Sequence, residues 1–264
     1  MSSPKISIIV ATYQAETCLE QCLASIFSQR NSAYEIIVVD GGSTDNTLKI
    51  IQAHSHRIHH WESGPDAGIY DAWNKALPHV TGDWIYFLGA DDRLASPDAL
   101  ERASRSLATA FPKYRVVYGS VQMVTPHGQP EEICGEPWES SGRKFRRSMT
   151  IPHQGAFHHR ELFDVRGNFD ISFRIAGDYE FLLREVKSHP ALFIPNLIIA
   201  NMTKGGVSFQ SIKTLKEIRR AKILHGESLL SAYFHYYNEV AFLYAVKWGG
   251  RIRRNLGIKK YGYR

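Results

Sequence analysis

An apolar segment of the sequence ends in two adjacent carboxylates. Residues 86–92, YFLGADD, have the composition of a buried strand and stop at Asp91 and Asp92. Two neighbouring anions repel each other, so a positive partner is expected nearby. The pair could cap a helix that begins near Pro97, but several residues intervene. A divalent cation held by one carboxylate, with a ribose hydroxyl bound by the other, accounts better for both charges.

Polar side chains also follow the other apolar segments of the first hundred residues. They are Thr12 with Tyr13, Asp40 and Asp66. In open α/β sheets, ligands bind outside the carboxyl ends of the strands. If these segments are neighbouring strands, their polar ends converge on one crevice and form a single site.

The elements that would position these residues alternate between strand and helix. Continuous β-branched runs predict strands, and apolar residues spaced by three and four predict helices. Strands are expected at residues 5–12, 34–40, 57–63, 83–88 and 115–124, and helices at 15–29, 43–54, 68–79, 177–189, 211–225 and 227–248. This order indicates an α/β fold with a mainly parallel central sheet flanked by helices and a C-terminal helical extension.

The turns of this sheet lack a phosphate-binding loop. The first turn, VATYQAETC, contains no glycine, and the sequence has no Walker-type loop. A pyrophosphate bound here would need another counterion, and a divalent cation held by carboxylate oxygens is the natural candidate. Residues 41–45, GGSTD, are interpreted as a tight turn with Asp45 as a helix cap, whereas Asp40 itself could bind a ribose or a base.

The charge distribution limits the classes of partner. The chain has 264 residues and a net charge of +6, but residues 247–264 carry seven basic side chains and no acidic one. The rest of the chain is close to neutral, which argues against a nucleic-acid-binding body. Three cysteines without zinc-ribbon spacing, and no recognisable export signal, predict reduced thiols and a cytoplasmic location.

Several segments, in this order, resemble the family 2 glycosyltransferases, which have the GT-A fold. The resemblance covers roughly residues 5–208. Within the family, the chain is most similar to bacterial enzymes that assemble O-antigen, capsule or exopolysaccharide repeat units. The segments are SIIVATYQAE, EIIVVDGGSTDNT, SGPDAGIYDAWNKALPHVTGDWIYFLGADD, IPHQGAFHHRELF and GDYEFLL.

The resemblance implies a nucleotide-sugar site and a metal site. Asp92 would bind Mn²⁺ or Mg²⁺ as the last carboxylate of the family's D-x-D element, although Gly89 stands where many members have Asp or Asn. The residues implied in nucleotide-sugar binding are Thr12, Tyr13, Asp40, Asp66, Asp71, Asn74, Lys75 and Asp91. Ile69, Trp73 and Leu77 of the same segment have the four-residue spacing of a core stripe.

The resemblance also implies the catalytic base. Asp178 in AGDYEFLL would take the proton of the acceptor hydroxyl, and a single base opposite the leaving group gives inversion of configuration. A plain helix cap is the alternative for this residue. His153 and Gln154 would lie near the donor sugar and the acceptor, and KGGVS at residues 204–208 resembles a segment that folds over the diphosphate.

Two further regions leave alternatives open. Residues 54–60, HSHRIHH, could suggest zinc, but a solvated connection is preferred because this spacing does not build a closed shell. The helix at 227–248 carries aromatic residues just before the basic tail, so it could hold an anionic membrane surface or pack on the catalytic domain.

The sequence therefore predicts a catalytic domain at residues 1–208 and a helical, basic extension at 209–264. The expected activity is inverting transfer from a nucleotide-diphosphate sugar to a polyprenyl-diphosphate-linked saccharide, at the cytosolic face of a bacterial inner membrane. The alternatives are a nucleotidyltransferase, which should have a glycine-rich basic first loop, and a catalytically silent nucleotide-binding scaffold.

Overall fold

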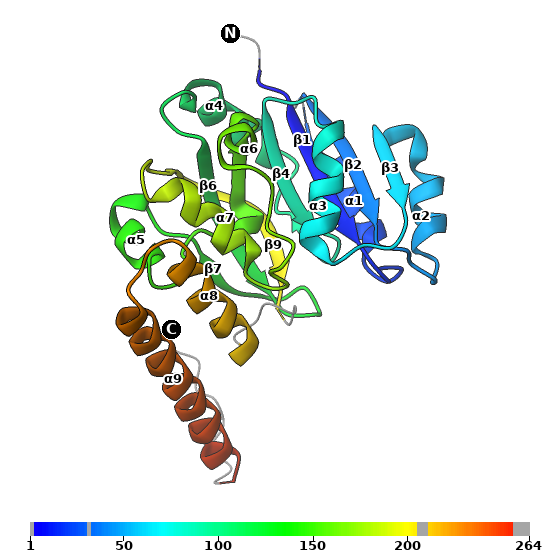
Figure 1. The fold of residues 1–264 in the computed structure, drawn as a ribbon. Helices are drawn as coiled ribbons and strands as arrows, with labels where there is room; N and C mark the ends of the chain where they lie inside the picture. Colours follow the sequence, from blue (N-terminus) through cyan, green and yellow to red (C-terminus); the bar gives the residue numbers. More distant parts are fainter. Residues whose placement is uncertain (1–2, 31–32, 205–210, 256–264) are drawn as a thin grey trace.

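The computed structural model describes residues 3–30, 33–204 and 211–255, with the side chains of 246–255 excepted. In this described part of the chain, nine strands form one sheet in the order β3-β2-β1-β4-β8-β6-β9-β5, with β7 paired to β6 (Figure 1). The strands are β1 (Ile6–Thr12), β2 (Tyr34–Asp40), β3 (His60–Ser63), β4 (Trp84–Gly89), β5 (Arg93–Leu94), β6 (Val116–Val124), β7 (Pro130–Cys134), β8 (Ala156–His159) and β9 (Leu192–Thr203).

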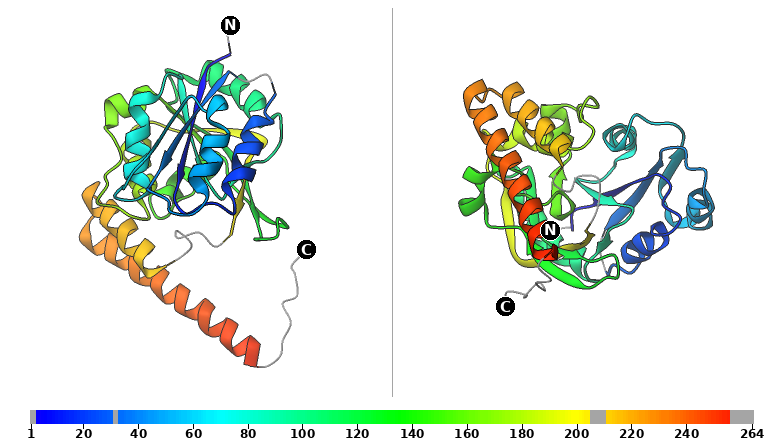
Figure 2. Two further views of the ribbon diagram at one scale, coloured as in Figure 1. Left: turned by 90° about the vertical axis from the view of Figure 1, so that its right-hand side faces the viewer. Right: turned by 90° about the horizontal axis from the view of Figure 1, so that it is seen from below.

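Helices cover both faces of this sheet (Figures 1 and 2). One face packs against α1, α2 and α4, and the other against α3, α5, α6 and α7. The helices are α1 (Leu19–Phe27), α2 (Thr47–Ala53), α3 (Ile69–Ala76), α4 (Ala99–Ala110), α5 (Trp138–Phe145), α6 (Glu161–Arg166), α7 (Gly177–Val186), α8 (Ile212–Leu224) and α9 (Leu229–Asn255). The predicted α/β architecture is confirmed.

The first four strands are parallel, as the sequence predicts. Strand β1 pairs with both β2 and β4, and the register sets Thr12 beside Asp40 and Ala11 beside Gly89. Ile8 and Val10 point to one helical layer and Ile9 to the other, so β1 is apolar on both faces. The carboxyl ends of these strands therefore meet at one edge of the sheet.

The second half of the sheet makes it mixed rather than parallel throughout. Strand β8 runs antiparallel to both β4 and β6, whereas β6 and β9 are parallel. Strand β8 thus lies in the middle of the sheet, between β4 and β6, although it follows both of them in the sequence. This arrangement brings the end of β9 and the start of α7 beside the end of β4.

The C-terminal helices extend from this body. Helix α8 packs on α7 and α9, and α9 projects away from the sheet (Figure 2). The predicted domain boundary at residue 208, the KGGVS segment beyond Lys204, and residues 256–264 of the basic tail lie outside the described residues. Within the described part of the chain, no helix has both the length and the apolar character needed to cross a bilayer.

Candidate functional site

A cavity of about 390 Å³ lies where the predicted polar ends meet. It is bounded by α3, the end of β4, the turn before β8, the start of α7 and the end of β9. Its lining is Ile69, Tyr70, Trp73, Gly89, Asp91, Asp92, His153, Gln154, Arg174, Ile175, Asp178, Met202 and Thr203. The structure therefore brings together five of the predicted site residues from three distant segments: Asp91, Asp92, His153, Gln154 and Asp178.

The two adjacent carboxylates sit at the end of β4. Asp92 is 3% exposed and accepts a hydrogen bond from the Thr203 backbone N–H at 3.0 Å. The Thr203 hydroxyl donates to the carbonyl of Asp91 at 2.9 Å, so the end of β9 fixes this turn. Helix α4 begins several residues later with Asp98 at its N-cap, so Asp91 and Asp92 do not cap it.

Gly89 allows both carboxylates to approach the end of β4. A Cβ atom added to Gly89 would lie 2.7 Å from Asp92 Oδ2 and 2.9 Å from Asp91 Oδ1. The two oxygens thus flank one small space. A side chain at this position would have to displace the pair.

This pair fits a hard divalent cation. Burial, together with the charge of Asp91, raises the pKa of Asp92 to about 8. A positive charge between the two oxygens would offset both effects. Carboxylate oxygens are the donors that Mg²⁺ and Mn²⁺ prefer, and such ions often take one or two protein carboxylates plus phosphate oxygens.

Asp178 lies in the first turn of helix α7 and lines the same cavity. Its Oδ1 accepts hydrogen bonds from the Tyr70 hydroxyl at 3.2 Å and from the Tyr179 N–H at 2.9 Å. Neither of these bonds goes to Oδ2. Burial raises the pKa of Asp178 to about 6, which suits a base that must be ionised near neutral pH.

A glycine makes this contact possible. A Cβ atom on Gly177 would lie 2.8 Å from the ring of Tyr70. The start of α7 can therefore approach α3 closely only without a side chain at residue 177. In this way Gly177 holds Asp178 against Tyr70.

Glu217 of α8 caps the loop that carries Asp178, a role that no sequence pattern predicted. Its carboxylate accepts hydrogen bonds from the backbone N–H groups of Arg174, Ile175 and Ala176 at 2.8 to 3.1 Å. These N–H groups precede α7 and have no partner within the helix. Its negative charge also raises the pKa of Asp178. Helix α8 thus positions the candidate base from outside the segment in which it lies.

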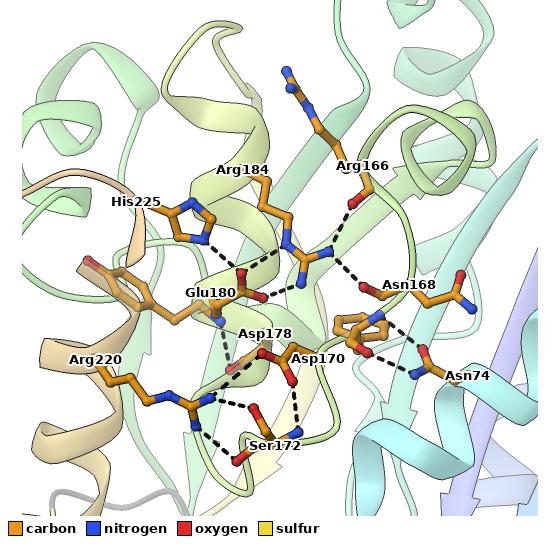
Figure 3. A network of polar contacts seen from close by, with 12 residues as sticks. Asn74, Arg166, Asn168, Asp170, Ser172, Asp178, Glu180, Arg184, Arg220 and His225 are labelled. Atoms are coloured by element: carbon orange, nitrogen blue, oxygen red, sulfur yellow. Dashed lines mark hydrogen bonds and ion pairs between the residues drawn. The ribbon is translucent and has the colours of Figure 1, made fainter. Parts of the chain in front are cut away.

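A second network fixes the body of α7 (Figure 3). The buried Glu180 forms an ion pair with Arg184 and contacts His225 Nε2 at 2.7 Å. Arg184 also donates to the carbonyl of Asn168 at 2.7 Å. These bonds tie α7 to the loop before it and to the end of α8, so the helix that begins at Asp178 is held on two sides.

His153 is buried in the same cavity. Its ring stacks on Trp73 with centroids 4.9 Å apart, and its Nε2 has no hydrogen-bond partner among the described residues. Burial lowers the pKa of His153 to about 3, so the imidazole is neutral near pH 7. Trp73, expected only as a core residue, also lines the cavity and has an unpartnered Nε1.

A neighbouring group of residues lies at the ends of β1 and β2. A Cβ atom on Gly41 would lie 2.7 Å from Asp66 Oδ2 and 3.3 Å from the ring of Tyr13. Tyr13 is 66% exposed, and the buried Thr12 hydroxyl has no hydrogen-bond partner in the described structure. The predicted residues Thr12, Tyr13 and Asp66 therefore lie together around Gly41.

Asp40 has a structural role in this conformation. The carboxylate is fully buried and accepts hydrogen bonds from Gly42 N, Ser43 N, Ser43 Oγ and Ser63 Oγ. It thus orders the turn after β2 and ties it to β3. Asp45 accepts from the Thr47 N–H at the start of α2, as expected of a cap. A nucleotide contact by Asp40 stays a prediction.

The three polar residues of α3 are also engaged within the protein. Asp71 accepts from the Ala67 N–H, and Lys75 donates to the carbonyl of Pro65. Asn74 exchanges two hydrogen bonds with the backbone of Phe169, at 2.9 and 3.0 Å. None of the three lines the cavity, so their assignment to nucleotide-sugar binding is a prediction that these contacts do not test.

The histidine-rich segment is dispersed. His54 contacts Glu20, and His59 lies 3.6 Å from Glu35. His60 stacks face to face on His79, with ring centroids 3.4 Å apart. Glu62 lies near these two rings. Imidazole binds metal ions in the plane of its ring, so two stacked rings do not aim at one ion, which favours the predicted solvated connection over a zinc site.

Comparisons with known proteins identify the family. Residues 7–162 match the family described as Glycosyl transferase family 2. The PGL/p-HBAD biosynthesis glycosyltransferase of Mycobacterium tuberculosis is 34% identical over 216 residues, covering 79% of this chain and 80% of that protein. The chondroitin synthase of Escherichia coli is 26% identical, covering 98% of this chain and 34% of that protein.

Solved structures share the fold at low sequence identity. TarS of S. aureus in complex with UDP-GlcNAc has a TM-score of 0.69 and 18% identity, covering 89% of this chain and 71% of that one. The mannosyltransferase PcManGT of Pyrobaculum calidifontis, in complex with GDP-Man and Mn²⁺, has a TM-score of 0.63 and 18% identity, covering 93% and 76%. The fold is therefore that of the GT-A glycosyltransferases.

The chain belongs to glycosyl transferase family 2 and is a glycosyltransferase. The predicted family and enzyme class are confirmed. This membership favours glycosyl transfer over the nucleotidyl transfer that the sequence left open.

Proposed function

We propose that this protein transfers a sugar from a nucleotide-diphosphate donor to a saccharide acceptor with inversion at the anomeric carbon. The observation that carries the proposal is a single cavity with Asp178 on one wall and the Asp91–Asp92 pair on another. Inversion needs one base on the face opposite the leaving group, and a partly buried carboxylate with a pKa of about 6 can serve as that base.

The reaction follows from these positions. Oδ2 of Asp178 accepts the proton of the acceptor hydroxyl while the hydroxyl oxygen bonds to the anomeric carbon. The bond between that carbon and the diphosphate oxygen breaks, and the electron pair leaves with the nucleoside diphosphate. Tyr70 and the Tyr179 N–H hold Oδ1, which orients the carboxylate toward the cavity.

Asp92 would bind Mn²⁺ or Mg²⁺, with Asp91 beside it for the cation or the ribose. A bound divalent cation would neutralise the developing charge of the departing diphosphate. The Mn²⁺ in the mannosyltransferase complex supports this assignment. His153, with an unpaired Nε2, and Gln154 would contact the donor sugar or the acceptor.

The nucleotide would extend from this cation toward Thr12, Tyr13 and Asp66. These residues surround Gly41, whose lack of a side chain lets Asp66 and Tyr13 lie close to the backbone. The complexes of related folds with UDP-GlcNAc and GDP-Man support a nucleotide-sugar donor. They differ in nucleotide and in sugar, so the proposal covers the class of donor only.

The substitution Asp178→Asn tests the assignment of the base. It preserves the shape of the side chain and leaves the cation-binding pair intact, so donor binding measured by calorimetry should stay within about twofold of wild type. Transfer should fall on the order of 10³-fold, since general base catalysis contributes roughly 10² to 10⁴. Equal loss of binding and transfer would show that Asp178 is not the base. A wild-type chain that binds donors without transfer would support the silent scaffold instead.

For the acceptor we propose a polyprenyl-diphosphate-linked saccharide in bacterial surface polysaccharide assembly, reached at the cytosolic face of the inner membrane. Helix α9 supports contact with a membrane surface because it exposes a stripe of apolar residues before the basic tail. The stripe comprises Leu230, Phe234, Tyr237 and Tyr244, each at least 59% exposed. Apolar and cationic groups together hold peripheral helices on anionic bilayers.

Removal of residues 248–264 tests this contact. The shortened chain loses six of the seven basic side chains of the tail, so its co-sedimentation with phosphatidylglycerol vesicles should fall at least tenfold. Donor binding, measured in parallel, should not change. Unaltered partition into the vesicle pellet would contradict the membrane role of the tail.

A further inference from the structure

A second and larger cavity lies among α5, α7, α8 and α9, apart from the candidate active site. Its volume is about 570 Å³. Five basic side chains line it, together with two histidines and a single carboxylate. The basic residues are Arg143, Arg146, Arg147, Lys187 and Lys222. The histidines are His225 and His235, and the carboxylate is Glu227.

The protein balances the positive charge of this cavity only in part. Glu227 is the carboxylate in its lining, and Glu239 of the adjoining groove also acts on Lys222. Within the described part of the chain, none of the five basic side chains takes part in an ion pair or donates a side-chain hydrogen bond. Lys144, which is not part of the lining, forms an ion pair with Glu136 at 2.8 Å. Glu227 is already engaged by Ser231 and His235. Like charges gathered without a counterion raise the electrostatic energy of the fold, and a bound anion would lower it.

Lys222 is the strongest indication of a ligand. Lys222 is only 4% exposed, and its ammonium group has no hydrogen-bond or ion-pair partner among the described residues. Burial is the main cause of a lowered pKa for this lysine. An almost fully buried lysine without a partner is costly, and buried charges are normally paired.

The cationic cavity continues into an apolar groove of about 400 Å³ between α8, α9 and β7. The two share Arg147, Lys222 and His235 in their linings. Most of the groove surface is apolar, with Met149, Leu215, Ile218, Ala232 and Leu243 in its lining, and Glu132, Arg219 and Glu239 also line it. A charged chamber that opens into an apolar channel has the polarity of an amphiphile with an anionic head.

The same helices connect this region to the candidate base. Ile218 in the groove follows Glu217, which caps the loop before Asp178. Lys187 follows the end of α7, the helix that begins beside Asp178. At 1.5 Å per residue, the backbone of Lys187 lies about 14 Å along the helix from that of Asp178. A ligand held here is therefore within reach of an acceptor sugar at the active site.

We propose that this cavity and groove bind the diphosphate and the adjoining hydrocarbon chain of an isoprenoid-diphosphate-linked acceptor. The five cations would hold the diphosphate, with Lys222 and Arg147 at the junction, and the groove would cover the first isoprene units. This inference rests on the proposed function, since it assigns a site to the lipid end of that acceptor.

Calorimetric titration of the full chain with farnesyl diphosphate in EDTA tests the site, because EDTA removes any cation that could hold the probe at Asp92. Arg147→Gln and Lys222→Met should each weaken binding at least tenfold. Lys213→Gln is the matched control, since it removes an exposed lysine of α8 that lines neither cavity, and it should bind as wild type does. Arg147 is exposed, so its variant reports on the site even if the Lys222 variant does not fold.

Three results would overturn the proposal: wild-type affinity in the Arg147 variant, equal affinity for inorganic diphosphate, and equal affinity for farnesol. Displacement of the probe by phosphatidylglycerol at equal phosphate concentration would also overturn it, in favour of a general phospholipid site. Parallel titration with nucleoside diphosphates and Mn²⁺ distinguishes failure of this site from failure of the proposed function. Donor binding without an effect of the variants on farnesyl diphosphate would refute only this site, whereas no donor binding would refute the proposed function.

Discussion

The two ends of the central sheet use buried carboxylates in opposite ways. At the amino end, Glu35 accepts hydrogen bonds from Ser7 Oγ, Thr81 N and Thr81 Oγ1 and forms an ion pair with Lys5 at 2.6 Å. These partners lower its pKa to about 2. At the carboxyl end, Asp92 is as buried as Glu35 and Asp178 is partly buried. Both have fewer partners than Glu35, and the pKa values of Asp178 and Asp92 rise to about 6 and 8.

This difference shows that burial alone does not determine what a carboxylate does. Hydrogen bonds and an opposite charge stabilise the ionised form, whereas burial without them destabilises it. Glu35 is fully satisfied by the protein and contributes to stability. Asp92 and Asp178 retain unsatisfied oxygens, which are available to a cation and to a proton. Sites with such unsatisfied groups commonly cost stability, because the protein is arranged for its ligand.

Stability measured against pH sharpens this comparison most strongly. Glu35→Gln should lower the free energy of unfolding by about 1.5–3 kcal/mol at pH 7, since charged hydrogen bonds of this kind contribute that much. The pKa of Glu35 is lower in the folded state, so its contribution is present above pH 4.5 and is lost as the pH falls toward 2. Thermal denaturation from pH 2 to 8 measures both effects.

Asp178→Asn should have the opposite effect in the same experiment. The pKa of Asp178 is raised in the folded state, so the wild type loses stability as the pH rises from 3.8 to 6. The variant avoids this loss and should melt higher above pH 6, by roughly 2–4 °C for each kcal/mol gained. Below pH 4 the two melting temperatures should converge. A variant less stable than wild type at pH 7 would break the comparison.

A smaller effect is expected from the two residues that adjust Asp178 from other helices. The Tyr70 hydroxyl lowers the pKa of Asp178, and the Glu217 charge raises it. Tyr70→Phe should therefore move the acidic limb of the kcat/KM profile to higher pH, and Glu217→Gln should move it to lower pH. Shifts in the same direction, or no shift in either variant, would mean that these side chains do not control the base.

The strands and the carboxyl-end site could be predicted because their signals are local. The runs KISIIVAT and EIIVVD are apolar and β-branched, and the polar residues that follow them must lie at one edge if the strands are parallel. That edge carries Asp91 and Asp92, as predicted. The mixed second half could not be predicted in this way, because β8 joins β4 and β6 by contacts between distant segments.

The positioning residues were missed for the same reason. Glu217 lies on a helix that looks like any amphipathic segment, and only its packing against residues 174–176 reveals its role. The polar residues of α3 show how little residue type alone reveals. Asp71, Asn74 and Lys75 hold backbone groups of neighbouring loops in this structure, and their assignment to nucleotide-sugar binding stays a prediction.

Calorimetric titration with UDP-GlcNAc, GDP-Man and other nucleotide sugars, with Mn²⁺ and again with EDTA, tests the central claim most directly. Wild type should bind one nucleotide class with Mn²⁺, and its affinity should fall on the order of 10²-fold in EDTA. Mutation of residues that support a metal ion lowers metal affinity or activity by about 10–100-fold, and loss of the ion itself should lower donor affinity at least as much. Asp92→Asn should bind equally weakly in both conditions. Wild-type binding that is the same with Mn²⁺ and with EDTA would contradict a cation at Asp91 and Asp92, and with it the account of why a buried strand ends in two carboxylates.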